Sequence, residues 1–294
     1  MPFLDPNFWS GLFRIGYFTT AVLIVLAVWW VARKSKAAWI AVPMTIAAVG
    51  WLPVHSAYQH SRAKQAFLEK EAAQIAHFNE RCKSAGEKIY EKVSGVEGIL
   101  IMKRRVVPRD VDYQDQYSLW DPYGTSPSEA EYPAAYLNDL RFEGYRSVGV
   151  RLEPIKGFRF VELLANSKAD PVSVIYRRYS FVEDQVGERV RDEKGNLVLK
   201  DDPVQTPQSR YGITWDDIST PEDRNLWVAG GRLRVVDLGT NKVIAERVGY
   251  LREPSLGSLA NNRLAWSYGE AYACPPLISG AYKDIFFLSK VLPR

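Results

Sequence analysis

The chain has 294 residues, of which 47% are hydrophobic and 24% are charged, and its formal net charge is +4 at neutral pH. This length allows one or two domains with a hydrophobic core. The positive excess lies mostly in residues 1–54, and basic and acidic residues nearly balance in the rest of the chain. Without a clustered basic face, the composition argues against a nucleic-acid partner.

Two uncharged apolar runs, residues 15–32 and 37–54, follow each other near the start of the chain. Each has about the length that the hydrocarbon core of a bilayer requires. A basic connector follows the first run in place of a small-residue cleavage site, which argues against a signal peptide. The sequence therefore predicts a two-helix transmembrane hairpin over residues 1–54.

The connector between the two runs, residues 33–36, reads Arg-Lys-Ser-Lys and contains no acid. Short basic loops stay on the cytoplasmic side of a membrane. Arg62, Lys64 and Lys70 beyond the second run argue the other way, but Glu69 and Glu71 offset them. We expect both termini outside, with the C-terminal domain in the periplasm and the spans in a bacterial inner membrane.

A helical pattern continues through residues 55–95. Its apolar stripe is Ile75, Phe78, Cys82, Ala85 and Ile89, at spacings typical of one helix face. We interpret the stripe as packing against a sheet. A coiled-coil dimer is the less favoured alternative, because this stripe sustains only about two heptads.

Residues 96–294 change to the alternating pattern of β-strands. Strands are expected over residues 98–107, 145–152, 158–164 and 172–182, with hairpins over residues 190–199 and 232–251 and a final short helix over residues 281–292. No internal repeat is expected. The predicted fold class is α+β: the transmembrane hairpin, a long helix over residues 55–95, and a mainly antiparallel-sheet domain over residues 96–294.

The chain has two cysteines, Cys82 and Cys274. An even count in an oxidising compartment favours a disulfide between them, whereas two buried thiols would be expected in the cytoplasm. With an external domain, we predict the disulfide.

The sequence shows no complete catalytic or metal-binding motif. The three histidines, His55, His60 and His77, all precede residue 78. The spacing of His77, Glu80 and Cys82 on a helix does not suit a metal ion. We therefore predict no metal, no cofactor and no catalytic residues.

Four acidic residues, Asp216, Asp217, Glu222 and Asp223, could be read as an acid/base pair of the kind that glycosidases use. The favoured interpretation is structural. Ser219 or Thr220 would cap a short helical turn that begins at Pro221, with acids near its positive end.

An aromatic segment lies in an acidic, proline-broken stretch before the second predicted strand, and it contains Tyr113, Tyr117, Trp120, Tyr123 and Tyr132. Such a composition is typical of a protein-binding surface, although the same side chains could instead fold back and cover the sheet.

These features together predict a membrane-anchored extracytoplasmic binding protein without catalysis. It would be either an accessory subunit of an envelope complex or an immunity-type protein that captures a toxin, with a protein partner in the cell envelope. The alternative is an envelope glycan or lipid hydrolase that uses the paired carboxylates.

Overall fold

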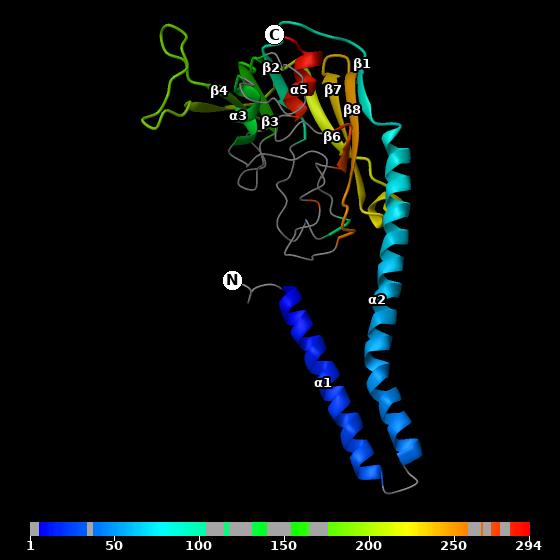
Figure 1. Ribbon diagram of the computed structural model, residues 1–294. Coiled ribbons are helices and arrows are strands. Elements are labelled where there is room, and N and C mark those ends of the chain that lie inside the picture. Colours follow the sequence, from blue (N-terminus) through cyan, green and yellow to red (C-terminus); the bar gives the residue numbers. More distant parts are fainter. Residues whose placement is uncertain are drawn as a thin grey trace. The chain divides into compact units, whose positions relative to one another are not determined.

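A computed structural model describes residues 6–33, 38–103, 115–117, 131–139, 154–164, 176–257, 266, 272–276 and 283–294 of the 294-residue chain (Figure 1). The described chain divides into two compact units, Met1–Glu69 and Lys70–Arg294. The predicted strand over residues 145–152 lies outside the described residues.

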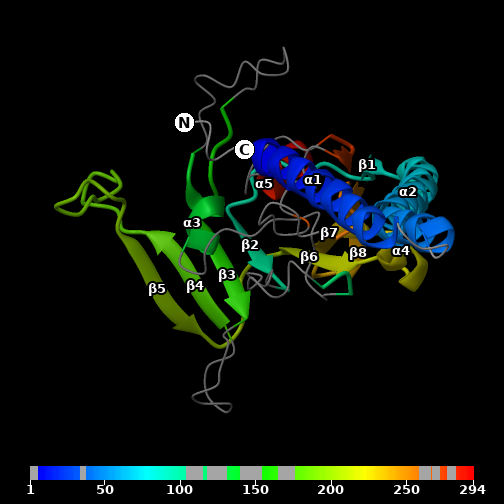
Figure 2. The same cartoon turned by 60° about the horizontal axis from the view of Figure 1, so that its bottom comes forward.

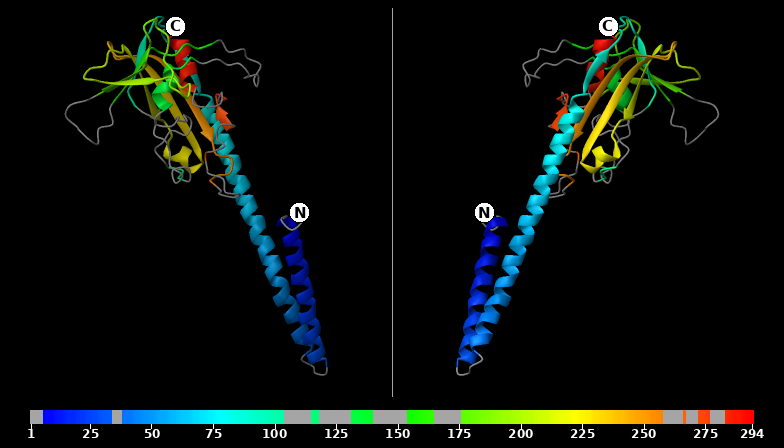
Figure 3. Two further views of the ribbon diagram at one scale, coloured as in Figure 1. Left: turned by 90° about the vertical axis from the view of Figure 1, so that its left-hand side faces the viewer. Right: turned by 90° about the vertical axis from the view of Figure 1, so that its right-hand side faces the viewer.

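The first unit contains two helices, α1 (Pro6–Ala32) and the first part of α2 (Ala38–Cys82). They lie side by side in Figures 1 and 3, and the Tyr17 hydroxyl donates a hydrogen bond to the Val49 carbonyl. Among the described residues, one helix, α2, is long and apolar enough to cross a membrane. The apolar part of α1, Gly16–Val31, is shorter, so the predicted two-span hairpin remains a proposal.

The helix α2 ends at Cys82, which corrects the prediction of a helix to residue 95. The chain turns through residues 83–85 and enters strand β1 (Gly86–Ile89), which pairs antiparallel with residues of a later strand, β8. Gly86 has φ +144°, a value that side-chain-bearing residues rarely adopt. Glu87 and Lys88 favour a helix by themselves, but pairing with β8 holds them in a strand.

A nine-stranded sheet forms the second unit. Its remaining strands are β2 (Gly98–Ile101), β3 (Phe160–Leu164), β4 (Tyr176–Phe181), β5 (Leu199–Val204), β6 (Tyr211–Asp217), β7 (Val228–Asp237), β8 (Lys242–Arg252) and β9 (Ala273–Cys274). The order is β1-β8-β7-β6-β2-β3-β4-β5, with β9 also on β8. The strand β2 runs parallel to β3 and β6, and the other pairings are antiparallel. The α+β class and the mainly antiparallel sheet are thus confirmed.

The main core lies between one face of this sheet and two helices, α3 (Glu131–Leu137) and α5 (Lys283–Val291). Leu137 and Phe287 are fully buried against strand residues such as Ile99 and Val235. The predicted C-terminal helix and the 232–251 hairpin are confirmed by α5 and by β7 with β8.

Two buried ionic groups link elements of the sheet domain. Arg247 on β8 donates to Asp284 on α5 at 2.7 Å, and both side chains are less than 10% exposed. Glu162 on β3 is fully buried and accepts hydrogen bonds from Arg178 and from the backbone and hydroxyl of Ser209. Burial opposes ionisation of Glu162, but these hydrogen bonds outweigh it and lower its pKa.

Gly230 in β7 lies against an aromatic side chain of the neighbouring strand β8. A Cβ atom added to Gly230 would lie 2.5 Å from the Tyr250 ring. The approaching group is a side chain of the neighbouring strand, so glycine makes room for an aromatic ring here.

Residues 182–198 form an arm beyond β4 and β5 that contains two successive eight-residue units (Figure 2). In each unit an aspartate, Asp184 or Asp192, accepts the N–H groups two and four residues later, and a glycine with positive φ follows three residues after it. This arrangement corrects the expectation that the chain has no internal repeat.

Three valines at eight-residue spacing close the base of the 182–198 arm. Val182 N–H donates to Val198 C=O, Val190 N–H to Val182 C=O, and Val198 N–H to Val190 C=O. The ring of backbone hydrogen bonds satisfies polar groups in a segment that extends from the sheet.

Candidate functional site

The acidic segment after β6 forms a capped helical turn, as predicted. The helix α4 (Pro221–Asn225) begins with Pro221, and Thr220 is its N-cap residue. The Thr220 hydroxyl accepts the Asp223 N–H at 3.1 Å, and the Asp223 carboxylate accepts the Thr220 N–H at 2.7 Å. This reciprocal capping box satisfies two N–H groups that the first turn of a helix leaves open.

The Asp223 carboxylate also binds the end of α2. It is fully buried and lies 2.5 Å from His77 Nε2, and Arg81 donates to its two oxygens at 2.7 and 2.5 Å. Arg81 donates a further hydrogen bond to the Thr220 hydroxyl. We call His77, Arg81, Thr220 and Asp223 the Asp223 cluster.

The cluster is built around a carboxylate that is ionised at neutral pH. Burial opposes ionisation of Asp223, but hydrogen bonds from Arg81, from the Thr220 backbone and from His77 outweigh it and lower its pKa to about 2. The hydrogen bond to Asp223 raises the pKa of Arg81 in turn. A general acid must hold a proton near neutral pH, so Asp223 does not suit that role.

The neighbouring aspartates are also engaged with arginines. Asp216 lies 2.7 Å from Arg234 and 3.3 Å from Arg232, and Asp217 lies 2.6 Å from the buried Arg224. These ion pairs connect β6 to β7 and to α4. The geometry thus favours a structural role for the segment and supplies no pair of carboxylates facing an open cleft among the described residues.

A polar stripe on α2 extends the contact beyond the Asp223 cluster. Gln74 is fully buried, and its amide donates to the carbonyls of Leu226, Trp227 and Glu253 at 2.8, 3.3 and 2.8 Å. Arg252 donates to the Gln74 side-chain oxygen at 3.1 Å. Both the amide nitrogen and the amide oxygen of Gln74 are thus hydrogen-bonded to the domain.

The predicted apolar stripe is therefore confirmed only in part: Ile89 packs against the main core, but it belongs to β1 and not to α2. Ile75, its first member, is 37% exposed, and Ala85 and Ile89 lie beyond the end of the helix. Gln74, His77 and Arg81 make the contact instead, at spacings of three and four residues. That spacing was visible in the sequence, but a polar stripe is ordinarily a solvated face.

Replacing Gln74 by methionine should lower the free energy of unfolding by about 1–3 kcal/mol, because buried carbonyls and Arg252 lose their partner. Urea denaturation of the full chain measures the change. Gln59→Met is the matched control on an exposed turn of the same helix, and it should have little effect. Equal stabilities of the two variants would contradict the assigned role of Gln74.

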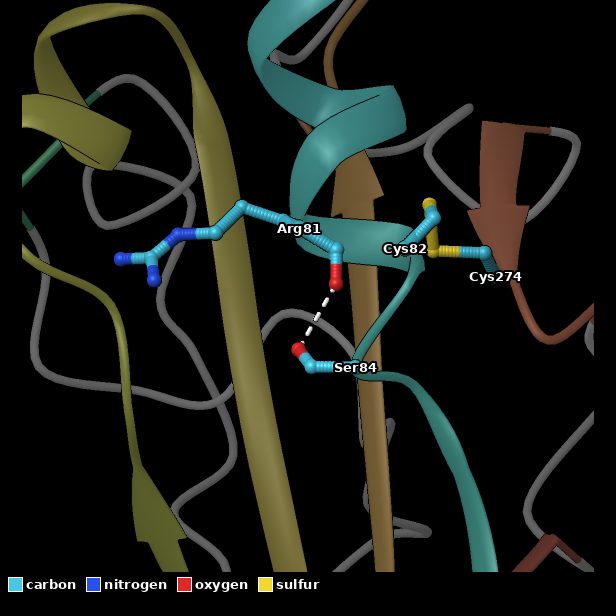
Figure 4. The surroundings of a disulfide bond; sticks show 4 residues. All are labelled: Arg81, Cys82, Ser84 and Cys274. Carbon is cyan, nitrogen blue, oxygen red and sulfur yellow. Dashed lines mark hydrogen bonds between the residues drawn. A yellow bond between two sulfur atoms is a disulfide. The ribbon is translucent and has the colours of Figure 1, made fainter.

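A disulfide joins the end of α2 to β9, as predicted. Cys82 and Cys274 are bonded, with their Cα atoms 5.7 Å apart. Figure 4 shows the bond at the last turn of α2, where Ser84 donates its hydroxyl hydrogen to the Arg81 carbonyl at 2.8 Å. Arg81 of the Asp223 cluster and Cys82 of the disulfide are adjacent in the chain. Together they attach the last turn of α2 to the sheet domain.

The predicted partner-binding residues are only partly described. Tyr113, Trp120 and Tyr123 lie outside the described residues. Tyr117 is 49% exposed, and its hydroxyl donates a hydrogen bond to Asn225, the last residue of α4. Tyr132 belongs to α3, whose later residues are buried in the core; its own side chain lies outside the described residues.

The remaining histidines, His55 and His60, are exposed on α2. Among the described residues no three His, Cys, Asp or Glu side chains gather as a metal site would require. No protein family, curated protein or solved structure matches the chain.

Proposed function

We propose that the protein is a membrane-anchored extracytoplasmic binding protein without catalysis. The observation that supports this most is the Cys82–Cys274 disulfide at the end of a helix whose first part is apolar enough to cross a membrane. Structural disulfides persist in oxidising compartments such as the bacterial periplasm and are rare in the cytoplasm. The bond thus supports an extracytoplasmic sheet domain, and the helix supports its anchorage in a membrane.

The side chains of the first unit support membrane insertion of both helices. Trp30 on α1 is 63% exposed, and Trp39 and Ile40 on α2 are 86% and 67% exposed. A soluble protein would bury large apolar side chains of this number, whereas a bilayer covers them with lipid. We include α1 as a second span, with the basic connector in the cytoplasm and both termini outside.

The binding role is supported by the position of Tyr117. Tyr117 presents half of its surface to solvent while its hydroxyl holds it against α4. A tyrosine ordered in this way offers contact area with little further loss of entropy on binding. The partner would be an envelope protein, as for an accessory subunit, or an incoming toxin, as for an immunity-type protein.

The topology is tested by fusing alkaline phosphatase or a fluorescent protein to Arg294. Active phosphatase with a dark fluorescent fusion is the expected result, since phosphatase needs an oxidising compartment to fold. The reverse pattern would place the domain in the cytoplasm and would refute the proposal.

The binding surface is tested with a photo-crosslinking amino acid in place of Tyr117 in the full chain. Irradiated membranes should yield one discrete adduct from position 117. The same probe at Val186, which is 81% exposed in the 182–198 arm, is the control and should give none. The same adducts from both positions, or none from position 117, would contradict the assigned surface.

A further inference from the structure

The helix α2 contains a segment that nothing in the described structure covers. Every described residue from Val54 to Lys70 is exposed. A helix of this length surrounded by water has marginal stability by itself, because little packing compensates its loss of conformational freedom. The faces of this segment are therefore available to a partner.

One face of this segment is free of charge over three heptads. The face consists of exposed residues at alternating spacings of four and three, and we call it the α2 seam: Val54, Tyr58, Ser61, Gln65, Leu68, Ala72 and Ile75. This alternation defines the a and d positions of a left-handed coiled coil. The seam runs about 32 Å along the helix.

The α2 seam is distinct from the faces that α2 already uses. Val49 contacts Tyr17 of α1, and Gln74, His77 and Arg81 contact the sheet domain. None of these residues belongs to the seam. The large seam residues keep substantial exposure: Val54 67%, Tyr58 56%, Leu68 49% and Ile75 37%.

Charges beside the α2 seam identify the occupant as a second copy of the chain. With Tyr58 and Gln65 at a, and Ser61 and Leu68 at d, Lys64 falls at g and Glu69 at the following e position. In a parallel, in-register dimer the g residue of one helix meets the next e residue of the other. Each Lys64 would then face Glu69 of the second copy, on both sides of the dimer.

The other flanking positions do not oppose this register. Ala57 at g would face Arg62 at e, and Glu71 at g would face Ala76 at e, so no like charges meet.

We infer that α2 forms a parallel coiled-coil homodimer through the α2 seam. The parallel direction follows from the proposed anchorage of both copies in one membrane, which also raises their effective concentration.

Cysteine crosslinking of the full chain in membranes tests the dimer. Both native cysteines are paired with each other, so a single introduced cysteine reports its own position. Leu68→Cys, at d, should form a disulfide-linked dimer under mild oxidation. Lys70→Cys, at the outward f position, should not.

A charge exchange then tests the identity of the partner. In the Leu68→Cys background, Lys64→Glu should weaken association about five-fold, because two attractive pairs become repulsive. Lys64→Glu with Glu69→Lys should restore crosslinking. Only a second copy of the same chain provides the exchanged charge.

Three results would overturn the inference: no dimer from position 68, equal dimer from positions 68 and 70, or no recovery in the exchanged variant. Alkaline carbonate extraction of the same membranes separately reports anchorage. An anchored chain without the crosslink would refute the dimer alone, whereas an extractable chain would refute the proposed anchorage.

Discussion

Replacing Asp223 by asparagine is expected to lower the free energy of unfolding by about 3 kcal/mol. The change keeps the size of the side chain but removes the buried negative charge that Arg81 and His77 share. The expected loss lies at the lower end for buried pairs because Arg81 is 29% exposed and water can partly replace the carboxylate. Urea denaturation of the full chain in detergent, followed by tryptophan fluorescence, measures it.

The pH dependence of this loss provides a second readout. The pKa of Asp223 is lowered from 3.8 to about 2 in the folded protein, so its ionisation contributes about 2 kcal/mol above pH 4. That contribution is lost as the pH falls towards 2. The wild type and the asparagine variant should therefore converge to within about 1 kcal/mol at pH 2.

Asp216→Asn is the matched control, because it removes a carboxylate of the same kind from a half-exposed ion pair. Its effect should be below about 1 kcal/mol. Equal effects of the two substitutions, or a loss in the Asp223 variant that does not change with pH, would show that the buried charge does not hold α2 to α4.

Removing the disulfide is expected to lower the free energy of unfolding by about 5 kcal/mol. The bond closes a loop of 192 residues, and the loss of unfolded-chain entropy increases with loop length. The double variant Cys82→Ser with Cys274→Ser, compared with the wild type in the same denaturation experiment, measures the effect.

The two single serine variants provide the control for this prediction. Each should lose about as much stability as the double variant, because each alone abolishes the cross-link. Reduction of the wild type should give a similar loss. Additive losses in the single variants would mean that local packing of the two cysteines, and not the cross-link, determines the stability.

Strong alternation made the 232–251 hairpin predictable. Leu233 and Val235 alternate with Arg232 and Arg234, and a turn-rich trio follows the first strand. The disulfide and the capped turn at Thr220 were predictable for a similar reason. The disulfide depends on two cysteines, and the capped turn depends on a hydroxyl residue followed by proline and acids. Each of these combinations occurs in few structural settings.

The strands β1 and β6 could not be recognised from local sequence. Glu87 and Lys88 favour a helix, and Asp216 and Asp217 are unusual in a strand. Their strand conformation depends on neighbours far away in the chain, Glu246 and Arg247 for β1 and Arg232 for β6. Which strands pair depends on the order of all the strands in the sheet, and local sequence does not reveal that order.

The docking face of α2 was missed because its residues are polar. Gln74 resembles a solvated position until the carbonyls of Leu226 and Glu253 are found beside it. The α2 seam was missed for a similar reason, because Ser61 and Gln65 lie between its apolar residues. In both cases the relevant information was which face of the helix stays exposed, and that follows only from the tertiary structure.

The Cys82–Cys274 bond also determines how the protein would respond to mechanical force. Suppose that α2 is pulled away from a partner that grips the last segment of the chain, after Cys274. Tension would pass from Cys82 directly to Cys274, and the chain between them, at a sequence separation of 192, would bear none of it. Roughly 650 Å of extended chain would then stay out of the stretched path. The load would fall instead on the segment after Cys274, which includes α5.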